Sequence, residues 1–215
     1  LLTAGAILNR RLIRLLQSHG YTRVAINDTM SQDIDLDDAI TFETRLQAER
    51  ALGRAVYTLV QGQTPNLNEV VDVVDNIIFE LKGKSQVSNG LYSIHSFDAN
   101  TFTHSINVCI LSIAIAMELN WPISKMRELG AGAILHDIGK ILMPLPVLNK
   151  PGRLTDDEYE LIKTHAHKGW ELLVNCYGVG SCASQAALEH HERIDGSGYP
   201  RKLTGSEISD FGKIT

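Results

Sequence analysis

Apolar residues recur at helical spacing along most of the chain. Between residues 67 and 81 they fall on every third or fourth position, and Gly83 follows where the run stops. This period puts them on one face of a helix, and a glycine just past the last turn commonly ends one. The segment 101–119 is apolar almost throughout, which predicts a helix that is buried on most of its sides. From about residue 36 onward, the pattern is that of an all-α body.

Side chains that cap helices mark where several of these segments begin. Asn66 with Glu69, and Thr155 with Glu158, have the three-residue spacing of a capping box, in which each member bonds to the backbone of the other. Ser124 is placed to cap the helix that follows it. We therefore expect helices to start at these three points.

Small residues predict close contacts between helices. Gly130 and Gly132 lie among alanines in the helix that follows Ser124, and their lack of bulk lets a neighbouring helix approach closely. The last helix is expected to span roughly residues 181–192 and to end in a Gly-Ser-Gly loop.

The first part of the chain has a different pattern from the rest. Residues 7–19 carry a short apolar stripe at helical spacing with Gly20 after it, and residues 21–26 alternate enough for one strand. A lone strand leaves its backbone groups unpaired, so it needs a partner strand upstream or in another chain. We expect a small α+β module for regulation or dimerisation at residues 1–60, and a mostly α domain at residues 61–215.

Composition narrows the class of function. The 215 residues carry a formal net charge of −5, which argues against binding to a nucleic acid polymer. Three cysteines without a CxxC pair indicate reduced thiols and a cytoplasmic location. The longest apolar stretch, around residues 106–117, is too short to cross a bilayer, so we expect no membrane segment in this chain. Because the chain opens on Leu1 and has no natural stop at Thr215, we expect a piece of a longer protein.

Six side chains of metal-binding type stand near the ends or on the apolar faces of four expected helices. They are His104, His136, Asp137, His165, His190 and His191. Helices packed in a bundle can bring such groups to one interior point, which is how bundles build metal sites. Imidazole nitrogen and carboxylate oxygen suit iron, manganese, zinc or nickel, whereas the absence of paired cysteines disfavours a structural zinc site. One helical histidine alone is more often a hydrogen-bonded core residue, so the interpretation depends on the whole set.

Asp137 is the residue expected to join two ions. Adjacent residues on a helix project about 100° apart, so His136 and Asp137 can serve one ion while the carboxylate reaches a second. His190 and His191 can clamp that second ion at a similar angle. Lys140 has two interpretations, because a lysine here can complement a helix dipole or reach a phosphate bound to the metals. Its place three residues after Asp137 favours the phosphate. No role in the site is expected for His19, His95 or His167.

The motifs together resemble a known family. ILHDIGK, LNKPGRLTDDE, the lone His165 and HHERIDGSGYP follow one another as in the HD-GYP family of bacterial cyclic di-GMP phosphodiesterases, within the HD superfamily of metal-dependent phosphohydrolases. The resemblance covers roughly residues 67–215. It implies an HD-type helical bundle that holds two or three metals, often iron or manganese, and hydrolyses cyclic di-GMP to pGpG or GMP.

Residue by residue, the resemblance implies that the six side chains above are metal ligands. Asp137 and Lys140 would be the catalytic residues, and Lys140 would contact the substrate phosphate. Gly198, Tyr199 and Pro200 match the GYP loop, which in the family borders the active site, is expected to bind substrate and can contact diguanylate cyclases. A homodimer is a further expected partner. The expected cofactors are two divalent ions, iron or manganese, with zinc, nickel or magnesium as alternatives, which activate a hydroxide for attack on the phosphodiester.

Two departures from the family pattern change these expectations. Some members carry a glutamate one turn before the first ligand histidine, which supports a third metal; Asn100 stands there, which predicts two metals. A further aspartate ligand and an Arg-containing segment that touches the nucleotide are expected beyond Thr215, so the catalytic domain is expected to be truncated. Two other functions stay open: a sensor that binds cyclic di-GMP without hydrolysing it, and an HD phosphohydrolase that acts on another cyclic dinucleotide or on mononucleotides.

Overall fold

The computed structural model describes residues 7–18, 38–84 and 101–215, without the side chains of Gln17, Ser18 and Thr101. The chain divides into two compact units, Leu1–Leu36 and Asp37–Thr215. Several expected features lie outside the described residues: Gly20, the strand at 21–26, His19, His95 and Asn100.

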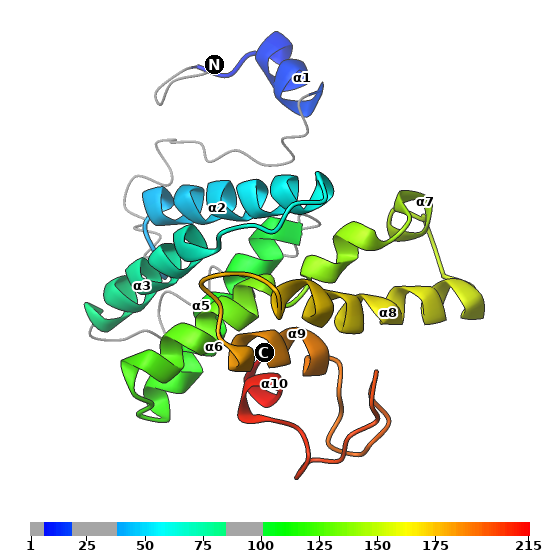
Figure 1. The fold of residues 1–215 in the computed structure, drawn as a ribbon. Helices are drawn as coiled ribbons and strands as arrows, with labels where there is room; N and C mark the ends of the chain where they lie inside the picture. The colour runs from blue at the N-terminus through cyan, green and yellow to red at the C-terminus, as the bar shows by residue number, and fades with distance from the viewer. Residues whose placement is uncertain (1–6, 19–37, 85–100) are drawn as a thin grey trace. The chain divides into compact units, whose positions relative to one another are not determined.

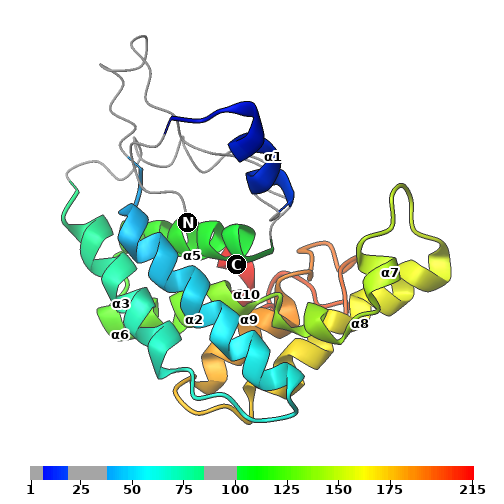
Figure 2. The ribbon, with the colours of Figure 1, turned by 90° about the horizontal axis from the view of Figure 1, so that it is seen from above.

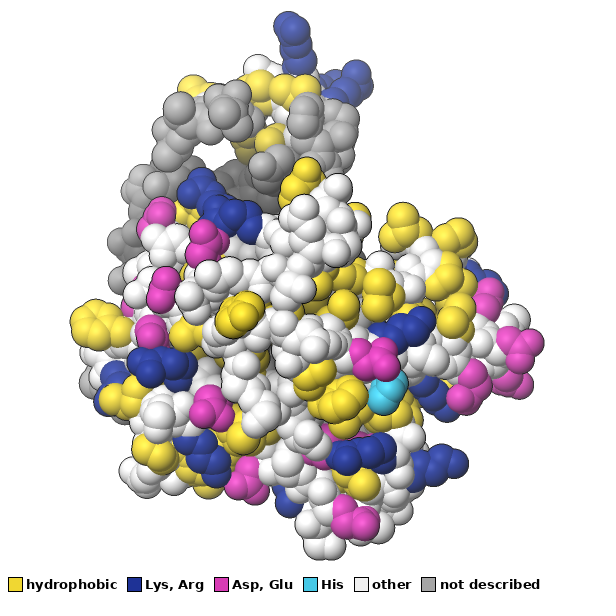
Figure 3. All heavy atoms as spheres, in the orientation of Figure 1, with side chains coloured by type: hydrophobic (Ala, Val, Ile, Leu, Met, Phe, Trp, Pro, Cys, Tyr) yellow, Lys and Arg dark blue, Asp and Glu magenta, His cyan; other side chains and the backbone are white. Residues whose placement is uncertain are grey.

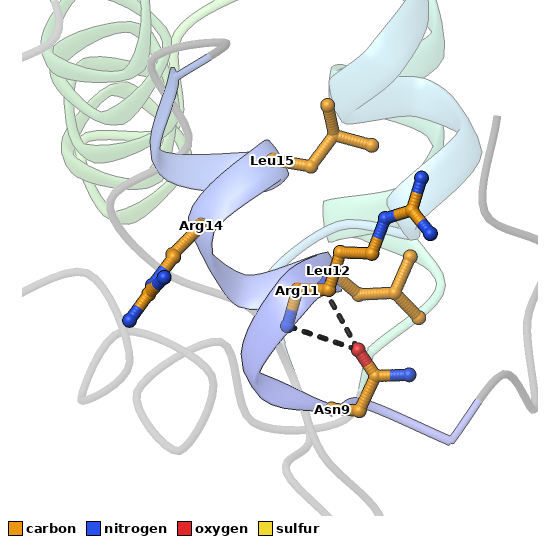
Figure 4. Close-up of a pocket in the computed structure, with 5 residues that line it drawn as sticks. All are labelled: Asn9, Arg11, Leu12, Arg14 and Leu15. Atoms are coloured by element: carbon orange, nitrogen blue, oxygen red, sulfur yellow. Dashed lines mark hydrogen bonds between the residues drawn. The ribbon is translucent and has the colours of Figure 1, made fainter.

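In the first unit, the described residues form helix α1 (Arg10–Ser18), which falls within the helix expected at residues 7–19. The side-chain oxygen of Asn9 accepts hydrogen bonds from the backbone N–H groups of Arg11 and Leu12, each at 3.0 Å (Figure 4). The first turn of a helix leaves such amides without a partner, so Asn9 acts as its cap. The residues that line a hollow on this helix are Asn9, Arg11, Leu12, Arg14 and Leu15.

The second unit is a bundle of helices (Figure 1). In chain order they are α2 (Phe42–Val60), α3 (Asn68–Lys82), α5 (Thr101–Glu118), α6 (Ile123–Leu135), the 3₁₀ helix η2 (Ile138–Leu142), α7 (Leu145–Leu148), α8 (Asp156–Leu173), α9 (Ser181–Glu189) and α10 (Asp210–Ile214). In the part of the chain that the structure describes, β-type pairing is limited to two isolated bridges, Asn66 with Tyr177 and Asp195 with Thr204. The expected mostly α fold class is confirmed.

The helices of the second unit pack through α5 and α6. Helices α2 and α3 lie side by side and both contact α5, while α3 also contacts α6 (Figures 1 and 2). Helix α6 packs in turn on α9, which contacts α8 and α10. Ile106, Ile110 and Ile113 of α5 are fully buried, whereas Leu111 and Ile115 are exposed. The prediction that α5 is buried on most of its sides is confirmed, with one face left open.

Helix α2 ends at Val60, where the sequence predicts the boundary between the N-terminal module and the catalytic domain. Its contacts are with α3, α5 and η2, inside the unit Asp37–Thr215. The packing therefore groups α2 with the helices that follow it, and the division into two functional domains at residue 60 stays a prediction.

The surface drawn in Figure 3 carries acidic and basic side chains interspersed with one another. Apolar side chains gather around α7, where Leu142 and Leu145 are exposed. Among the described residues, no helix combines the length and the apolar character needed to span a bilayer.

The capping box expected at Thr155 and Glu158 is confirmed. The hydroxyl of Thr155 accepts a hydrogen bond from the N–H of Glu158 at 3.3 Å, and the carboxylate of Glu158 accepts one from the N–H of Thr155 at 2.7 Å. The two residues are only three positions apart, so this cap forms from local interactions alone. It fixes the start of α8.

The capping box expected at Asn66 and Glu69 is wrong. Asn66 bonds to the backbone amide two residues ahead, but Glu69 pairs with Arg54 of α2 at 2.6 Å. The N–H of Leu67 donates to the carbonyl oxygen of Tyr177 at 3.0 Å. The start of α3 therefore combines the local bond of Asn66 with a contact from a distant segment, and Glu69 takes no part in it.

Two other helix limits differ from the expected ones. Ser124 lies in the first turn of α6 and does not cap it, because Pro122 holds the cap position. Helix α9 ends at Glu189 instead of near residue 192, and a further short helix, α10, follows. Helix α10 has five residues, too few for a helical apolar period to show in the sequence.

Two glycines of α6 let neighbouring helices approach it closely. A methyl group on Gly132 would lie 2.7 Å from the carbonyl oxygen of Ala183 in α9. One on Gly130 would lie 2.6 Å from the Val74 side chain in α3. The close approach expected at these two glycines is confirmed.

The contact between η2 and α8 also depends on glycine. A methyl group on Gly139 would overlap the carbonyl oxygen of His165 and lie 2.6 Å from the backbone nitrogen of Gly169. The two segments therefore touch backbone to backbone. Because Asp137 comes two residues before Gly139, this contact sets its carboxylate beside His165.

Gly139→Ala should destabilise the protein, because the added methyl group meets backbone atoms of α8 that no side-chain rotation can move. We expect a loss of at least about 1–3 kcal/mol in the free energy of unfolding, the usual cost of overpacking. Gly53→Ala in α2 is the matched control, since the nearest atom to its added methyl group is 4.0 Å away. In this control, alanine is a better helix former than glycine, so the free energy of unfolding should rise by up to about 1 kcal/mol. Urea denaturation measures both, and equal stability of the two variants would contradict the packing argument.

Candidate metal centre

Four helical segments bring the six expected side chains together. His104 lies in the first turn of α5 and His165 lies in the middle of α8, while His136 and Asp137 join α6 to η2, and His190 and His191 directly follow α9. The ligand atoms of His104, His136 and Asp137 lie within 4.8 Å of one another, as do those of Asp137, His165, His190 and His191. Asp137 belongs to both groups.

The two oxygens of Asp137 face different histidines. Oδ2 lies 3.2 Å from Nε2 of His136 and 3.8 Å from Nε2 of His104. Oδ1 lies 3.3 Å from Nε2 of His165 and 3.6 Å from Nε2 of His190. The carboxylate therefore stands between two sets of imidazoles and offers one oxygen to each.

Hydrogen bonds fix the orientation of three of these rings. Each ring places Nδ1 against a carbonyl oxygen of the preceding turn: His136 against Ala133 (2.7 Å), His165 against Ile162 (2.7 Å) and His190 against Ala187 (2.9 Å). A carbonyl oxygen can only accept, so Nδ1 carries the proton and, in the neutral ring, Nε2 carries none. Histidines that bind metals through Nε2 are commonly held in this way.

Three acceptor atoms in the centre of the cluster, around Oδ1 of Asp137, face one another without a donor among the described residues. Nε2 of His165 and Nε2 of His190 are 3.2 Å apart, so two nitrogens without protons face each other. Oδ1 of Asp137 is buried, and no hydrogen-bond donor for it is found in the described part of the chain. Buried acceptors without a donor are costly, and a cation placed among them would satisfy all three.

Burial controls the charge of the imidazoles. It lowers the pKa values of His104, His190 and His191, and for His191 the neighbouring rings of His190 and His165 add to the effect and bring the pKa to about 3. The pKa of Asp137 lies below its usual range, although burial by itself would raise it. Neutral imidazoles around an ionised carboxylate are the donor set that a divalent metal requires.

Lys140 supplies positive charge at the other oxygen of the carboxylate. Its ammonium lies 2.6 Å from Oδ2 of Asp137, and its side chain is 32% exposed. Since the group lies at the edge of the cluster, it can be reached from solvent and can also touch a ligand held there.

The GYP residues meet the cluster through Tyr199. The Tyr199 ring stacks on the ring of His191, with 4.6 Å between centroids and 26° between planes. The backbone N–H of Tyr199 donates a hydrogen bond to the carbonyl oxygen of His191 at 3.2 Å. Burial raises the pKa of the Tyr199 hydroxyl. Gly198 is buried, and a methyl group on it would lie 2.5 Å from the α-carbon of Glu192. Pro200 is exposed.

Two carboxylates next to the His190-His191 pair were not expected to take part in the site. Glu189 is 1% exposed and accepts hydrogen bonds from the guanidinium of Arg201 and from the backbone N–H of Ser209. Glu192 accepts hydrogen bonds from backbone amides of the same loop. In the sequence, the one sign of their role is a glutamate on either side of the histidine pair. The groups that bond to these glutamates lie 9 to 20 residues further along the chain and come close only in the folded protein.

His167, for which no role was expected, lies outside the cluster. Its ring is exposed on α8, 3.4 Å from a carboxylate oxygen of Glu171 and stacked on Trp170. It is two residues from His165, which places it on another face of the helix.

The chain belongs to the HD domain family, since the model of that family matches residues 91–215. A cyclic di-GMP phosphodiesterase of Pseudomonas aeruginosa is 40% identical over 153 residues, which cover 71% of this chain and 37% of that protein. A cyclic di-GMP phosphodiesterase of Thermotoga maritima is 42% identical over 118 residues, or 54% of this chain and 32% of that protein. A 3′3′-cGAMP-specific phosphodiesterase of Vibrio cholerae is 40% identical over 108 residues, or 50% of this chain and 25% of that protein. These matches confirm the resemblance predicted from the motifs.

The chain thus spans about a quarter to a third of the length of these curated relatives. Among solved structures, Bd1817, an HDG"Y"P protein from Bdellovibrio bacteriovorus, has a similar fold, with a TM-score of 0.65 at 22% identity. The match covers 87% of this chain and 60% of that one. The helical bundle expected from the resemblance is therefore confirmed.

The metal-free protein should lose stability as the pH falls below about 6.5, the usual pKa of histidine. Folding lowers the pKa of His191 to about 3, so between these two values the unfolded chain binds a proton that the folded protein does not bind. Stability then rises with pH through this window and is lost as the pH falls. Denaturation in a chelating buffer across about pH 4.5–7.5 measures the effect. His191→Gln should make the decline shallower than in the wild type or in the control His167→Gln; equal slopes in all three would contradict the prediction.

Proposed function

We propose that this protein is a metal-dependent phosphodiesterase that hydrolyses cyclic di-GMP to pGpG, GMP or both. One observation carries the proposal: a single buried carboxylate, Asp137, is shared by two groups of imidazoles whose ligand atoms lie within 4.8 Å of one another. This arrangement suits two metal ions with one bridging ligand, and such pairs are common in enzymes that cleave phosphate esters. The relatives named as cyclic di-GMP phosphodiesterases support the choice of substrate.

We assign all six side chains as ligands. His104, His136 and Asp137 would hold one divalent ion, and Asp137, His165, His190 and His191 would hold a second. Support for this comes from Oδ1 of Asp137, a buried acceptor for which the described residues offer no donor. Imidazoles with one carboxylate suit iron or manganese, with zinc, nickel or magnesium as alternatives. Bound ions of this kind activate water at neutral pH and polarise a phosphate.

Lys140 is the second residue that we assign to catalysis. Its ammonium is held against Asp137 and is partly exposed, so an incoming phosphate oxygen can replace the carboxylate oxygen as its partner. A positive charge already fixed in place stabilises the negative charge that builds up on phosphorus during hydrolysis. Lys140 therefore binds the substrate phosphate and supports the chemical step.

We assign the rim of the substrate site to Gly198, Tyr199 and Pro200. The stacking of Tyr199 on His191 supports this, because it puts an aromatic ring next to a proposed ligand. Aromatic rings offer nucleobases a stacking surface. A contact of this loop with a diguanylate cyclase, a homodimer, and a regulatory module at residues 1–60 beside a catalytic domain at residues 61–215 remain predictions.

The choice of cyclic dinucleotide has a second candidate. The 3′3′-cGAMP-specific phosphodiesterase of Vibrio cholerae and the cyclic di-GMP phosphodiesterase of Pseudomonas aeruginosa are each 40% identical to this chain over their matched residues. Both substrates present the same phosphodiesters and differ in one base. Discrimination between them therefore depends on contacts at the rim, and the metal centre would serve either one. A sensor that binds cyclic di-GMP without hydrolysing it is the third alternative.

Asp137→Asn should abolish both metal binding and hydrolysis, because a neutral amide cannot balance the charge of two cations. We expect turnover to fall by more than the about 10–100-fold that loss of a partner in the outer shell of a metal site costs. Metal analysis and nucleotide chromatography measure the two effects. Asp157→Asn, at an exposed position in the first turn of α8, is the control and should keep both properties. Hydrolysis at the wild-type rate by Asp137→Asn would refute the assignment.

A substrate panel separates the three candidate functions. The protein, loaded with Mn²⁺ or Fe²⁺, should consume cyclic di-GMP and release pGpG or GMP, as followed by chromatography over time. Faster consumption of 3′3′-cGAMP at equal concentration would transfer the proposal to that substrate. Cyclic di-GMP that is bound but recovered unchanged would identify a sensor. Bis(p-nitrophenyl) phosphate serves as a control for a working metal centre, because it contains the ester bond without the bases.

A further inference from the structure

The most deeply buried charge next to the metal centre has no part in the proposed chemistry. Glu189, the last residue of α9, is 1% exposed and stands directly before His190. Its carboxylate accepts hydrogen bonds from the guanidinium of Arg201, from the side chain of Gln185 at 2.5 Å and from the N–H of Ser209 at 2.9 Å. An acid is rarely buried so fully without a positive partner, and Arg201 is that partner here.

Arg201 belongs to the loop that carries the GYP residues. It follows Pro200 directly, and its own backbone N–H donates to the carboxylate of Glu192 at 2.6 Å. The N–H of Leu203 donates to the other oxygen of Glu192 at 2.8 Å. Two carboxylates on either side of the histidine pair therefore hold the same end of the loop.

His191 is the proposed ligand that depends most on this loop. His136, His165 and His190 are each oriented by a hydrogen bond from Nδ1 to a carbonyl oxygen. For the ring of His191, the described residues provide ring contacts and no hydrogen bond: it packs against His165, His190 and Tyr199. The face that touches Tyr199 is thus set by where the loop lies.

We propose that Glu189 and Arg201 form a positioning pair, which holds Tyr199 against His191 and so keeps that imidazole aimed at the metal. This inference rests on the proposed function, because it takes His191 to be a ligand. Neither Glu189 nor Arg201 belongs to the two groups of candidate ligand atoms. They act through the loop and through the stacked ring.

Arg201→Met tests the pair, because it keeps an unbranched side chain and removes the charge that faces Glu189. The measurement is the affinity of the metal-free protein for Mn²⁺ by calorimetry, together with hydrogen exchange of residues 193–203. We expect one of the two ions to bind about 10–100-fold more weakly, the range found when outer partners of a metal ligand are lost. The loop should also exchange faster. Arg193→Met is the matched control, since Arg193 is an exposed arginine of the same loop whose nearest acid, Asp195, is 3.6 Å away.

A double-mutant cycle separates positioning from general loss of structure. If the pair acts through His191, Arg201→Met should weaken Mn²⁺ binding in the wild type and have little further effect in a His191→Gln background. Equal losses in both backgrounds, or Mn²⁺ affinity unchanged by Arg201→Met, would overturn the inference. If Arg201→Met does not fold, Arg201→Lys, which keeps a positive charge, replaces it in the same cycle and should show a smaller loss in the same direction. A wild-type protein that takes up no Mn²⁺ at all would overturn the proposed function, and this inference with it.

Discussion

The burial of one carboxylate among imidazoles is the interaction on which the candidate site depends. Asp137 is 4% exposed, and a carboxylate is expensive to remove from water unless charges or hydrogen bonds replace the solvent. At Oδ2, the ammonium group of Lys140 replaces the solvent. Oδ1 instead faces Nε2 atoms of His165 and His190, and the carbonyl bonds at the far side of those rings leave these nitrogens without protons. The fold thus holds a buried carboxylate oxygen that a cation could satisfy, and the described residues offer it no donor.

The close packing of backbones keeps that arrangement in place. Gly139 lets η2 lie directly on α8, and Gly132 does the same for α6 on α9. Three of the segments that carry the candidate ligands are thereby held in close backbone contact. Side chains at Gly139 and Gly132 would meet backbone atoms of α8 and α9 and would push these segments apart. The candidate site therefore depends on Gly132 and Gly139 as well as on the side chains that form it.

The sequence could predict what depends on local pattern. The mostly α class, the buried α5 and the Thr155–Glu158 cap all follow from spacings within one segment. The six side chains that cluster were recognisable because motifs in separate helices carry them. Where distant segments decide, the sequence was insufficient: the bond from Leu67 to Tyr177 helps to set the start of α3. In the sequence, Glu189 and Arg201 likewise look like two ordinary surface charges. Their contact exists only because the loop that carries Arg201 returns to the end of α9.

The stretch from Glu189 to Glu192 contains two candidate ligands and two carboxylates that hold the neighbouring loop. Consecutive residues near a helix end project about 100° apart, so four of them point to all sides of the chain. His190 and His191 face Asp137, while Glu189 and Glu192 face the loop that returns at Arg201. The candidate ligands and the loop of the proposed rim are therefore held by one short segment. Since the Tyr199 ring stacks on that of His191, the proposed positioning pair would link the shape of the proposed substrate rim to the geometry of the proposed metal site.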